Sequence, residues 1–305
     1  MKTVDPFDIR VADWFLKKVK NYKVKRSLQV EKTNNDKWNK LFSGKDFIIH
    51  TLNDGLLIKL YKDSDFSREI YDGFEISDLQ FMQKILKQGD FFIDAGANIG
   101  LFSLFASKLV GKNGKVFSFE PTAITYKRFL ENCALNNIEN IQAENIGLSE
   151  NDGQLFLNIS ENGLDAWNTF ASQSHIQFGK GENVPVKKLD NYIKEKAIDF
   201  SKIKFIKIDV EGWEIPVIKG AKDLLLANDK IVLMVEFTQK NSIAAGFDCY
   251  KLYDEVTALG YQWFFYHAEQ NILTPDKKRT QYPYFNLIAA KDVEALNKFV
   301  PVKNI

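Results

Sequence analysis

Glycines and an aspartate follow one another closely in the stretch FFIDAGANIG. Asp94 is followed by Gly96, Ala97, Asn98 and Gly100. Because glycine has no Cβ, Gly96 permits a sharp turn and Gly100 permits the close approach of a following helix. In parallel α/β sheets, ligands bind beyond the carboxyl ends of the strands, near the point where the strand order reverses. The sequence therefore predicts that this loop lines a ligand site.

The spacing of the glycines limits which ligand this loop can hold. The dinucleotide fingerprint G-x-G-x-x-G needs glycines at 96, 98 and 101, but these last two positions are Asn98 and Leu101. No Lys-Ser/Thr pair follows, so the P-loop pattern fails as well. A nicotinamide-dependent oxidoreductase is therefore the less favoured enzyme alternative.

Two acidic residues end the first two predicted strands of this region. Glu120 and Pro121 close the strand KVFSFEP, twenty residues beyond Gly100. A carboxylate there can accept hydrogen bonds from both ribose hydroxyls, and Asp94 would attract a cation where it would repel a phosphate. S-adenosyl-L-methionine fits because its sulfonium is cationic and its amino acid end is zwitterionic. The simpler interpretation is that Asp94 only caps a helix and that Glu120 is a surface charge.

A second acidic group follows the apolar stretch that ends in KIDVEG. Asp209 and Glu211 alternate around Val210, so both point to one side if the strand continues, and Glu236 ends the next strand, KIVLMVEF. A hydroxyl is a poor nucleophile until a group accepts its proton. We expect Asp209 to be that base, with Glu211 and Glu236 beside it. The candidate cofactor contacts from all these stretches are Asp94, Gly96, Ala97, Asn98, Gly100, Glu120, Pro121 and Asp209.

Three carboxylates at adjacent strand ends have other uses. They could hold a divalent cation that lowers the pKa of the hydroxyl directly. No Asp-Asn pair follows Glu236, however, and no metal ligand is assigned from the sequence. Asp209 could also cap the helix that begins near Glu214, a role compatible with catalysis. His175, in an expected substrate-side insertion at about 151–185, is the histidine best placed to contact the substrate.

Strands alternate with helices over most of the chain after residue 90. Apolar runs joined by helices of 10–15 residues indicate βαβ units and a mostly parallel sheet buried on both faces. Seven strands are expected, and the polar loop before the last one (271–285) has no room for a helix, so the final strand is expected to be antiparallel. The predicted fold class is α/β, a Rossmann-like sheet. A hairpin around Asn53-Asp54-Gly55 is expected before it.

Several stretches, in this order, resemble the FkbM family of methyltransferases: FFIDAGANIG, FSFEP with FLENCALNN, VPVKKLDNYI, FIKIDVEGWEIPVIKGA and LMVEF. The likeness covers roughly residues 69–240. It implies a class I fold and S-adenosylmethionine-dependent O-methylation of a sugar, glycolipid, polysaccharide or secondary metabolite. It also implies that Gly96, Asn98 and Gly100 line the cofactor, with Glu120 on the ribose. Asn145 and Ile146, after the predicted third strand at 140–149, would lie beside the adenine.

Composition and charge are those of a globular protein of 305 residues. The apolar fraction is 45%, the charged fraction is 27% and the formal net charge is +1, which does not suggest a nucleic-acid partner. Residues 1–40 carry eleven Lys/Arg against five Asp/Glu. Such a basic start is compatible with peripheral contact to an anionic membrane surface, although a solvated helix face is the plainer interpretation.

The expected organisation is an N-terminal extension (1–68) followed by a methyltransferase domain (69–305). Two distant cysteines without CxxC spacing argue against a disulfide framework or a zinc site. Neither a secretory signal nor a membrane span is visible, and a cytoplasmic location is expected. A small-molecule or glycan acceptor is the expected partner. A non-catalytic module of the same fold is the second alternative, and the sequence does not indicate the oligomeric state.

Overall fold

The computed structural model describes residues 35–73, 76–160, 168–171 and 178–303. The chain forms two compact units, residues 1–48 and 49–305. In the first unit, residues 35–42 are helical, and the rings of Trp38 and Phe42 pack edge to face with centroids 4.8 Å apart. The basic helix expected near the N-terminus lies outside the described residues, so its membrane contact stays a prediction, as does a domain boundary at 68/69.

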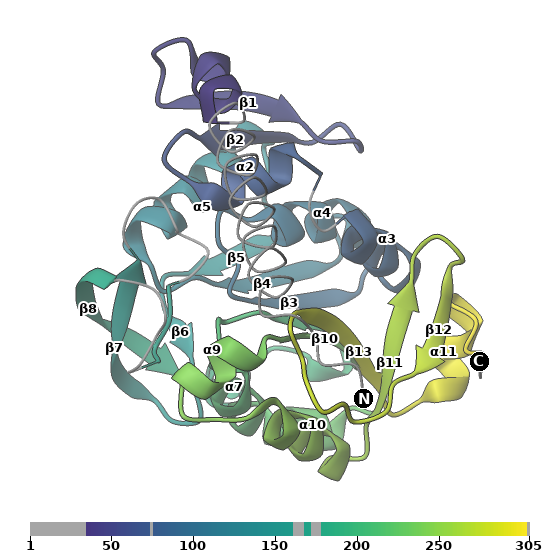
Figure 1. The fold of residues 1–305 in the computed structure, drawn as a ribbon. Coiled ribbons are helices and arrows are strands. Elements are labelled where there is room, and N and C mark those ends of the chain that lie inside the picture. The colour runs from purple at the N-terminus through teal and green to yellow at the C-terminus, as the bar shows by residue number, and fades with distance from the viewer. Residues whose placement is uncertain (1–34, 74–75, 161–167, 172–177, 304–305) are drawn as a thin grey trace, which may run out of the picture. The chain divides into compact units, whose positions relative to one another are not determined.

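An eight-stranded sheet forms the centre of the second unit, as far as the structure describes it (Figure 1). The strand order is β12-β11-β13-β10-β9-β3-β4-β5. The strands β5, β4, β3, β9 and β10 are parallel, and β13 runs antiparallel between β10 and β11. The bounds are β3 (Phe91–Ala95), β4 (Lys115–Phe119), β5 (Ile141–Glu144), β9 (Ile203–Ile208), β10 (Val232–Phe237), β11 (Gln262–His267), β12 (Ile272–Pro275) and β13 (Phe285–Ala290).

The predicted Rossmann-like, mostly parallel sheet with an antiparallel last strand is confirmed, with two differences. The polar stretch expected to be a loop contains β12, whose Ile272 and Leu273 are buried against the sheet edge. The predicted third strand divides after Glu144. Its second part, β6 (Gly147–Leu148), pairs with β8 (Phe178–Lys187) in a separate three-stranded sheet with β7 (Gly153–Ser160). β12 pairs with the neighbouring strand β11, from His267↔Ile272 onward, whereas the partner of β6 lies about forty residues further along the chain.

Helices cover both faces of the large sheet. Figure 1 shows α3 and α4 on one side of it and α7 and α10 on the other. The bounds are α2 (Asp65–Tyr71), α3 (Ile76–Ile85), α4 (Leu101–Val110), α5 (Ala123–Leu135), α6 (Leu189–Glu195), α7 (Glu214–Gly220), α8 (Lys222–Ala227), α9 (Gln239–Ala244), α10 (Cys249–Ala258) and α11 (Val293–Phe299). Among the described residues, no helix combines the length and the apolarity that crossing a membrane requires.

Two local predictions can be checked at the ends of elements. The hairpin expected around Asn53-Asp54-Gly55 forms between β1 (Phe47–Thr51) and β2 (Leu57–Tyr61), with Gly55 at φ +88°. The helix expected to begin near Glu214 does begin there, as α7, and Ala221 separates it from the next helix, α8. Pro216 lies in the first turn of α7, where its missing N–H costs no hydrogen bond.

The strand β3 shows why the sheet holds the site in place. Phe91, Ile93 and Ala95 belong to the core cluster that includes residues of α6, α7 and α10. Phe92 alternates with them and stacks on Phe205 of β9, with ring centroids 5.7 Å apart. Full burial of a phenylalanine contributes about 1.5–3 kcal/mol. The strand is therefore anchored on both faces directly before the glycine loop.

Candidate active site

A cavity of about 350 Å³ lies beyond the carboxyl ends of β3, β4, β9 and β10. This is the point at which the strand order reverses, because β3 is followed in sequence by β4 on one side and is paired with β9 on the other. Ligands of open α/β sheets bind at such positions, and pockets for small molecules have volumes of about 300–1,000 Å³. The site predicted from the glycine loop therefore coincides with a cavity of suitable size.

The glycine loop after β3 has a backbone that few side chains tolerate. Gly96 has φ +85°, and a Cβ there would lie 1.8 Å from the backbone oxygen of Asp209. Asn98 also has a positive φ, +50°, and its Oδ1 accepts a hydrogen bond from the N–H of Ile99 at 2.7 Å. Such local side-chain bonds make Asn a frequent non-glycine residue in this region. Gly96, Ala97 and Asn98 all line the cavity.

Glu120 holds the loop from the end of β4. Its Oε2 accepts the backbone N–H of Asn98 at 3.0 Å, and its Oε1 accepts that of Thr122 at 2.8 Å. The Asn145 amide donates to the carbonyl oxygens of Glu120 and Pro121 at 2.9 and 3.0 Å. Glu120 is 6% exposed and, with Pro121, lines the cavity. The carboxylate expected near a ribose is thus fixed at the cavity wall.

Asp94, Gly100, Asn145 and Ile146 are candidate cofactor contacts that do not line this cavity. For Gly100 the structure gives a packing reason, because a Cβ there would lie 2.2 Å from the ring of Phe129 on α5. Asn145 instead positions the backbone after β4 through its two donated hydrogen bonds. Next to Ile146, the lining residues are Gly147 and Leu148. The expectation that Asn145 and Ile146 lie beside the adenine therefore stays a prediction, and the two residues that follow them line the cavity.

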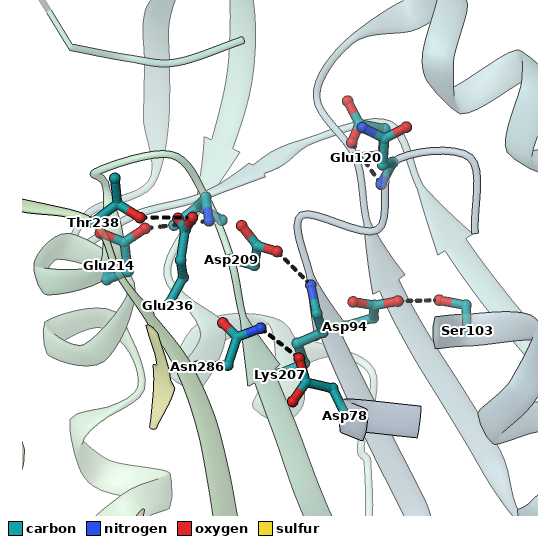
Figure 2. A network of polar contacts seen from close by, with 12 residues as sticks. Asp78, Asp94, Ser103, Glu120, Lys207, Asp209, Glu214, Glu236, Thr238 and Asn286 are labelled. Carbon is teal, nitrogen blue, oxygen red and sulfur yellow. Dashed lines mark hydrogen bonds and ion pairs between the residues drawn. The ribbon is translucent and has the colours of Figure 1, made fainter. Parts of the chain in front are cut away.

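Asp94 is turned away from the cavity. It is 1% exposed, and its Oδ2 accepts a 2.5 Å hydrogen bond from Ser103 of α4 (Figure 2). Burial raises the pKa of Asp94, while the nearby Lys207 opposes this rise. This placement does not support a direct charge contact between Asp94 and a cofactor. The physical reason is the pleat of β3, which directs residue 94 toward α4.

Lys207 is a buried cation beside the cavity to which the sequence analysis assigns no role, although it begins the stretch KIDVEG. It pairs in register with Asp94 across β3 and β9 and is 3% exposed. Its Nζ donates to Oδ2 of Asp209 at 2.7 Å (Figure 2). The same Nζ lies 4.4 Å from the centre of the Phe102 ring. A lysine inside an apolar central strand was the available signal, because lysine is almost never fully buried without a partner.

A polar pair on α3 and β13 adds to the charges around Lys207. Asn286 of β13 donates to Oδ2 of Asp78 on α3 at 2.7 Å (Figure 2). Burial raises the pKa of Asp78 to about 6, while the Asn286 hydrogen bond and the charge of Lys207 lower it. Lys207 therefore acts on Asp78 and Asp94 as well as on Asp209.

The segment after β9 is a turn, not a continued strand. β9 ends at Ile208, Glu211 has φ +54° and Gly212 has φ +96°. A Cβ at Gly212 would lie 2.4 Å from the backbone oxygen of Asn241, so the turn is packed tightly on α9. Asp209 and Glu211 both line the cavity, as expected. The expected reason, alternation along a continued strand, is wrong, because a turn places them there.

Asp209, Glu211 and Glu236 converge. One carboxylate oxygen from each lies within 4.8 Å of those of the other two. The Asn241 amide donates to Oε2 of Glu211 at 2.6 Å, and the Thr238 hydroxyl donates to Oε1 of Glu236 at 2.9 Å. The three candidate catalytic carboxylates are thus brought together in one wall. His175, the fourth catalytic candidate, lies outside the described residues.

Burial and mutual repulsion change the proton affinity of this wall. Burial raises the pKa of Glu211 and of Glu236 well above the ordinary glutamate value, and the neighbouring carboxylates raise it further. Burial also raises the pKa of Glu214 to about 7, although Glu214 accepts the N–H groups of Gly212 at 3.0 Å and Val210 at 3.3 Å. Crowded buried carboxylates retain protons unless a cation enters.

The remaining cavity wall comes from parts of the chain that gave no sequence signal. Phe66 and Glu69 of α2 line it, as do Pro283 and Tyr284 before β13. Each of these residues is far in sequence from the glycine loop. Their contribution depends on long-range packing, so no motif or spacing could have identified them.

The strand order, with β13 antiparallel between β10 and β11, defines the Rossmann-like fold of class I methyltransferases. The glycine loop at the strand switch and the acidic residues at the ends of β4, β9 and β10 line one cavity. The chain itself belongs to the FkbM methyltransferase family, since the family described as "Methyltransferase FkbM domain" matches residues 94–263. The resemblance inferred from the sequence is therefore confirmed.

Two curated relatives are similar over part of the chain. "Methyltransferase 1" of Beauveria bassiana (strain ARSEF 2860) is 30% identical over 148 residues, covering 44% of this chain and 59% of that protein. "Methyltransferase sdnD" of Sordaria araneosa is 30% identical over 163 residues, covering 45% and 62%. The chain thus spans about three fifths of the length of these relatives. Among solved structures, M. jannaschii TYW2 in complex with AdoMet has a TM-score of 0.39 at 15% identity, covering 80% of this chain and 85% of that one.

Proposed function

We propose that the protein is an S-adenosylmethionine-dependent methyltransferase that methylates a hydroxyl oxygen of a sugar-like acceptor, a glycolipid, a polysaccharide or a secondary metabolite. One observation carries the proposal. A single cavity has a glycine loop with a fixed carboxylate on one side and converging carboxylates on the other. Membership of the FkbM family and the methyltransferase names of the two fungal relatives support it.

The residues on the glycine-loop side fit S-adenosylmethionine. No lysine or arginine occurs in residues 96–100, so the loop lacks the basic group that a phosphate would favour. Glu120 stands at the cavity wall, and an ionised carboxylate offers about four acceptor sites for N–H and O–H donors. Phe119 and Leu148 add apolar surface to the same cavity, which suits a purine ring. The bound cofactor would supply a methyl group made electrophilic by the sulfonium.

The acidic side is the proposed place of the acceptor hydroxyl. As the methyl carbon bonds to the acceptor oxygen and leaves sulfur, the hydroxyl proton must pass to a base. Asp209 is the proposed base or orienting group, because Lys207 holds one of its oxygens at 2.7 Å and so fixes the carboxylate. Glu211 and Glu236 flank it. Holding the reacting atoms in line supplies a large part of the rate of such a displacement.

Thermal unfolding with S-adenosylhomocysteine, with NAD and with buffer alone tests the cofactor. A ligand at about one hundred times its Kd stabilises the folded state by about 2.7 kcal/mol, which raises Tm by several degrees. We expect this rise with S-adenosylhomocysteine and none with NAD. A rise with NAD alone would support the oxidoreductase alternative, and no rise with either would support a non-catalytic module.

The acceptor class is tested with a labelled methyl donor and fractionated sugars, lipids and small metabolites. We expect label in a carbohydrate or glycolipid fraction, in an alkali-stable ether linkage. Label that appears only on an amine nitrogen or a carboxylate ester would contradict hydroxyl methylation while preserving the methyltransferase proposal. The test works for an unidentified acceptor, because the label follows the transferred methyl group.

A further inference from the structure

The three convergent carboxylates have the geometry of ligands around one small cation. Oxygens on opposite sides of a cation that binds oxygen at about 2.1–2.4 Å are about 4.2–4.8 Å apart, and neighbouring ones are closer. One oxygen each from Asp209, Glu211 and Glu236 lies within 4.8 Å of the others. A single cation can therefore reach all three side chains without a rearrangement of the backbone.

A buried oxygen of Glu236 has no partner among the described residues. The residue is 5% exposed and lines the cavity, its Oε1 accepts from Thr238, and its Oε2 makes no hydrogen bond. Leaving a buried acceptor unsatisfied costs about 1–3 kcal/mol, and more when the group is charged. The unpartnered Oε2 of Glu236 is a second observation, separate from the convergence of the three residues, and a bound cation would satisfy it.

Each of the three carboxylates is also oriented by a donor from outside the cluster. Lys207 holds Asp209 at 2.7 Å, Asn241 holds Glu211 at 2.6 Å and Thr238 holds Glu236 at 2.9 Å. Carboxylates that bind metals are usually hydrogen-bonded in this way, because the outer donors fix the direction of the binding oxygens.

The charges of this wall leave a deficit that a divalent cation would balance. Once all three carboxylates are ionised, they and the ammonium of Lys207 have a net charge of −2, which one divalent cation balances, and Lys207 is the sole Lys or Arg among the described lining residues. Glu214 lies close by but is satisfied by the turn's N–H groups and does not line the cavity. Carboxylate oxygens without nitrogen or sulfur ligands favour Mg²⁺, Mn²⁺ or Ca²⁺ over Zn²⁺.

We propose that Asp209, Glu211 and Glu236 form a binding site for one divalent cation of the Mg²⁺ or Mn²⁺ kind. The site opens into the cavity, so an acceptor hydroxyl can occupy a remaining coordination position. Coordination lowers the pKa of the hydroxyl, whose proton then passes to water or to a flanking carboxylate. Binding of the ion stands on the geometry alone, whereas its part in methyl transfer rests on the proposed function.

Binding of Mn²⁺ to the full chain, freed of metal with EDTA and desalted, tests the site. Calorimetry, or the loss of the free-ion electron paramagnetic resonance signal, should show one site in the wild type. Glu236→Gln should weaken Mn²⁺ binding at least about tenfold, because it removes a charged ligand. The matched control is Glu214→Gln, which changes a neighbouring carboxylate that accepts the N–H groups of Gly212 and Val210 and is not a ligand, so affinity should change by less than about threefold.

Equal Mn²⁺ affinity in the wild type and in Glu236→Gln, with both folded by circular dichroism, would overturn the site. Equal weakening by the two variants would also overturn it, because the effect would then be one of net charge alone. If Glu236→Gln does not fold, Glu211→Gln serves as the ligand variant under the same criteria. Methyl transfer that proceeds unchanged in EDTA by a wild type that binds no Mn²⁺ would remove the site and keep the proposed function. Specific Mn²⁺ binding without any S-adenosylhomocysteine binding would support the metal site and contradict the proposed function.

Discussion

The two sides of the cavity differ in how fully their polar groups are satisfied. On the glycine-loop side, each oxygen of Glu120 accepts a backbone N–H, at 3.0 and 2.8 Å. On the acidic side, three carboxylates converge and Glu236 has a buried oxygen without a partner among the described residues. The first side is stable in its binding shape before any ligand arrives. The second is completed only by a proton, a cation or a substrate, which is typical of a site for chemistry.

Backbone contacts join the two sides. The Asp209 N–H donates to the carbonyl oxygen of Ala95 at 3.1 Å, and Gly96 leaves room for the backbone oxygen of Asp209. The distance between the cofactor loop and the proposed base is therefore set by main-chain atoms, which move less than side chains. Each of the following predictions tests whether the loop side and the acidic side have separate roles.

The largest effect is expected for Asp209→Asn, which should abolish most turnover and keep cofactor affinity. Removing a general base typically reduces the rate by about 10²–10⁴-fold, and Asp209 also balances the charge of buried Lys207. Initial rates with a labelled methyl donor and calorimetry with S-adenosylhomocysteine measure the two quantities. Asp229→Asn, an exposed carboxylate paired with Lys291, is the control. Full activity of Asp209→Asn would remove the base assignment.

Gly96→Ala should damage the loop side and reduce cofactor affinity and stability together. The new Cβ would meet the Asp209 backbone oxygen at 1.8 Å, in addition to the strain of φ +85°. The left-handed conformation alone costs about 1–2 kcal/mol, and the overlap adds about 1–3 kcal/mol. Gly89→Ala is a matched control, with φ +90° and nothing within 4 Å of the new Cβ. Similar urea midpoints for the two variants would show that close approach to Asp209 is unimportant.

A smaller effect is expected for Glu120→Gln. It should weaken S-adenosylhomocysteine binding by about tenfold, or about 1.4 kcal/mol. The rate of methyl transfer at saturating cofactor should change little. The substituted amide can accept only one of the two N–H groups of Asn98 and Thr122 and faces the other with its own donor. Calorimetry measures the affinity. Glu150→Gln, beside exposed Lys219, is the control. An unchanged Kd would remove Glu120 from the cofactor site.

The smallest effect is a pH dependence of stability that originates on the acidic side. The pKa of Glu214 rises from an ordinary 4.5 to about 7 on folding, so between these values the native state binds more protons than the unfolded state. Stability contributed by this group is present below about pH 4.5 and is lost as the pH rises through 7. In EDTA, we expect the Tm of the wild type to fall over this range more steeply than that of Glu214→Gln. Parallel profiles would contradict the assignment.

Much of the site could be predicted because its strands and turns are locally encoded. The strands β3, β4 and β10 begin and end within two residues of the apolar stretches FFIDAG, KVFSFEP and KIVLMVEF, whereas β9 ends at Ile208 and does not continue to Gly212. Glu120, Asp209, Glu211 and Glu236 all line the cavity as expected. Their placement follows from a simple rule, that polar residues ending parallel strands meet at one edge of the sheet.

The failures share a physical cause, which is that they concern orientation or distant partners. Asp94 turns toward Ser103 because of the strand pleat, and the spacing of FFIDAG does not say which face of β3 packs on a helix. Lys207 lies in the stretch KIDVEG, but its residue type alone does not reveal that it contacts Asp209. Phe66 and Tyr284 reach the cavity from elements far away in the chain. Such contacts exist only once the sheet has assembled.

The sequence by itself determined the alternation of strands and helices, the bare backbone of the glycine loop and the acidic residues at the strand ends, because periodicity and residue type act over a few neighbouring residues. Only the tertiary structure decided that Glu236 meets Asp209 and Glu211. That convergence requires β10 to pair beside β9 and a left-handed turn at Glu211 and Gly212. Both depend on packing between segments that are separate in the chain, where no local preference can act.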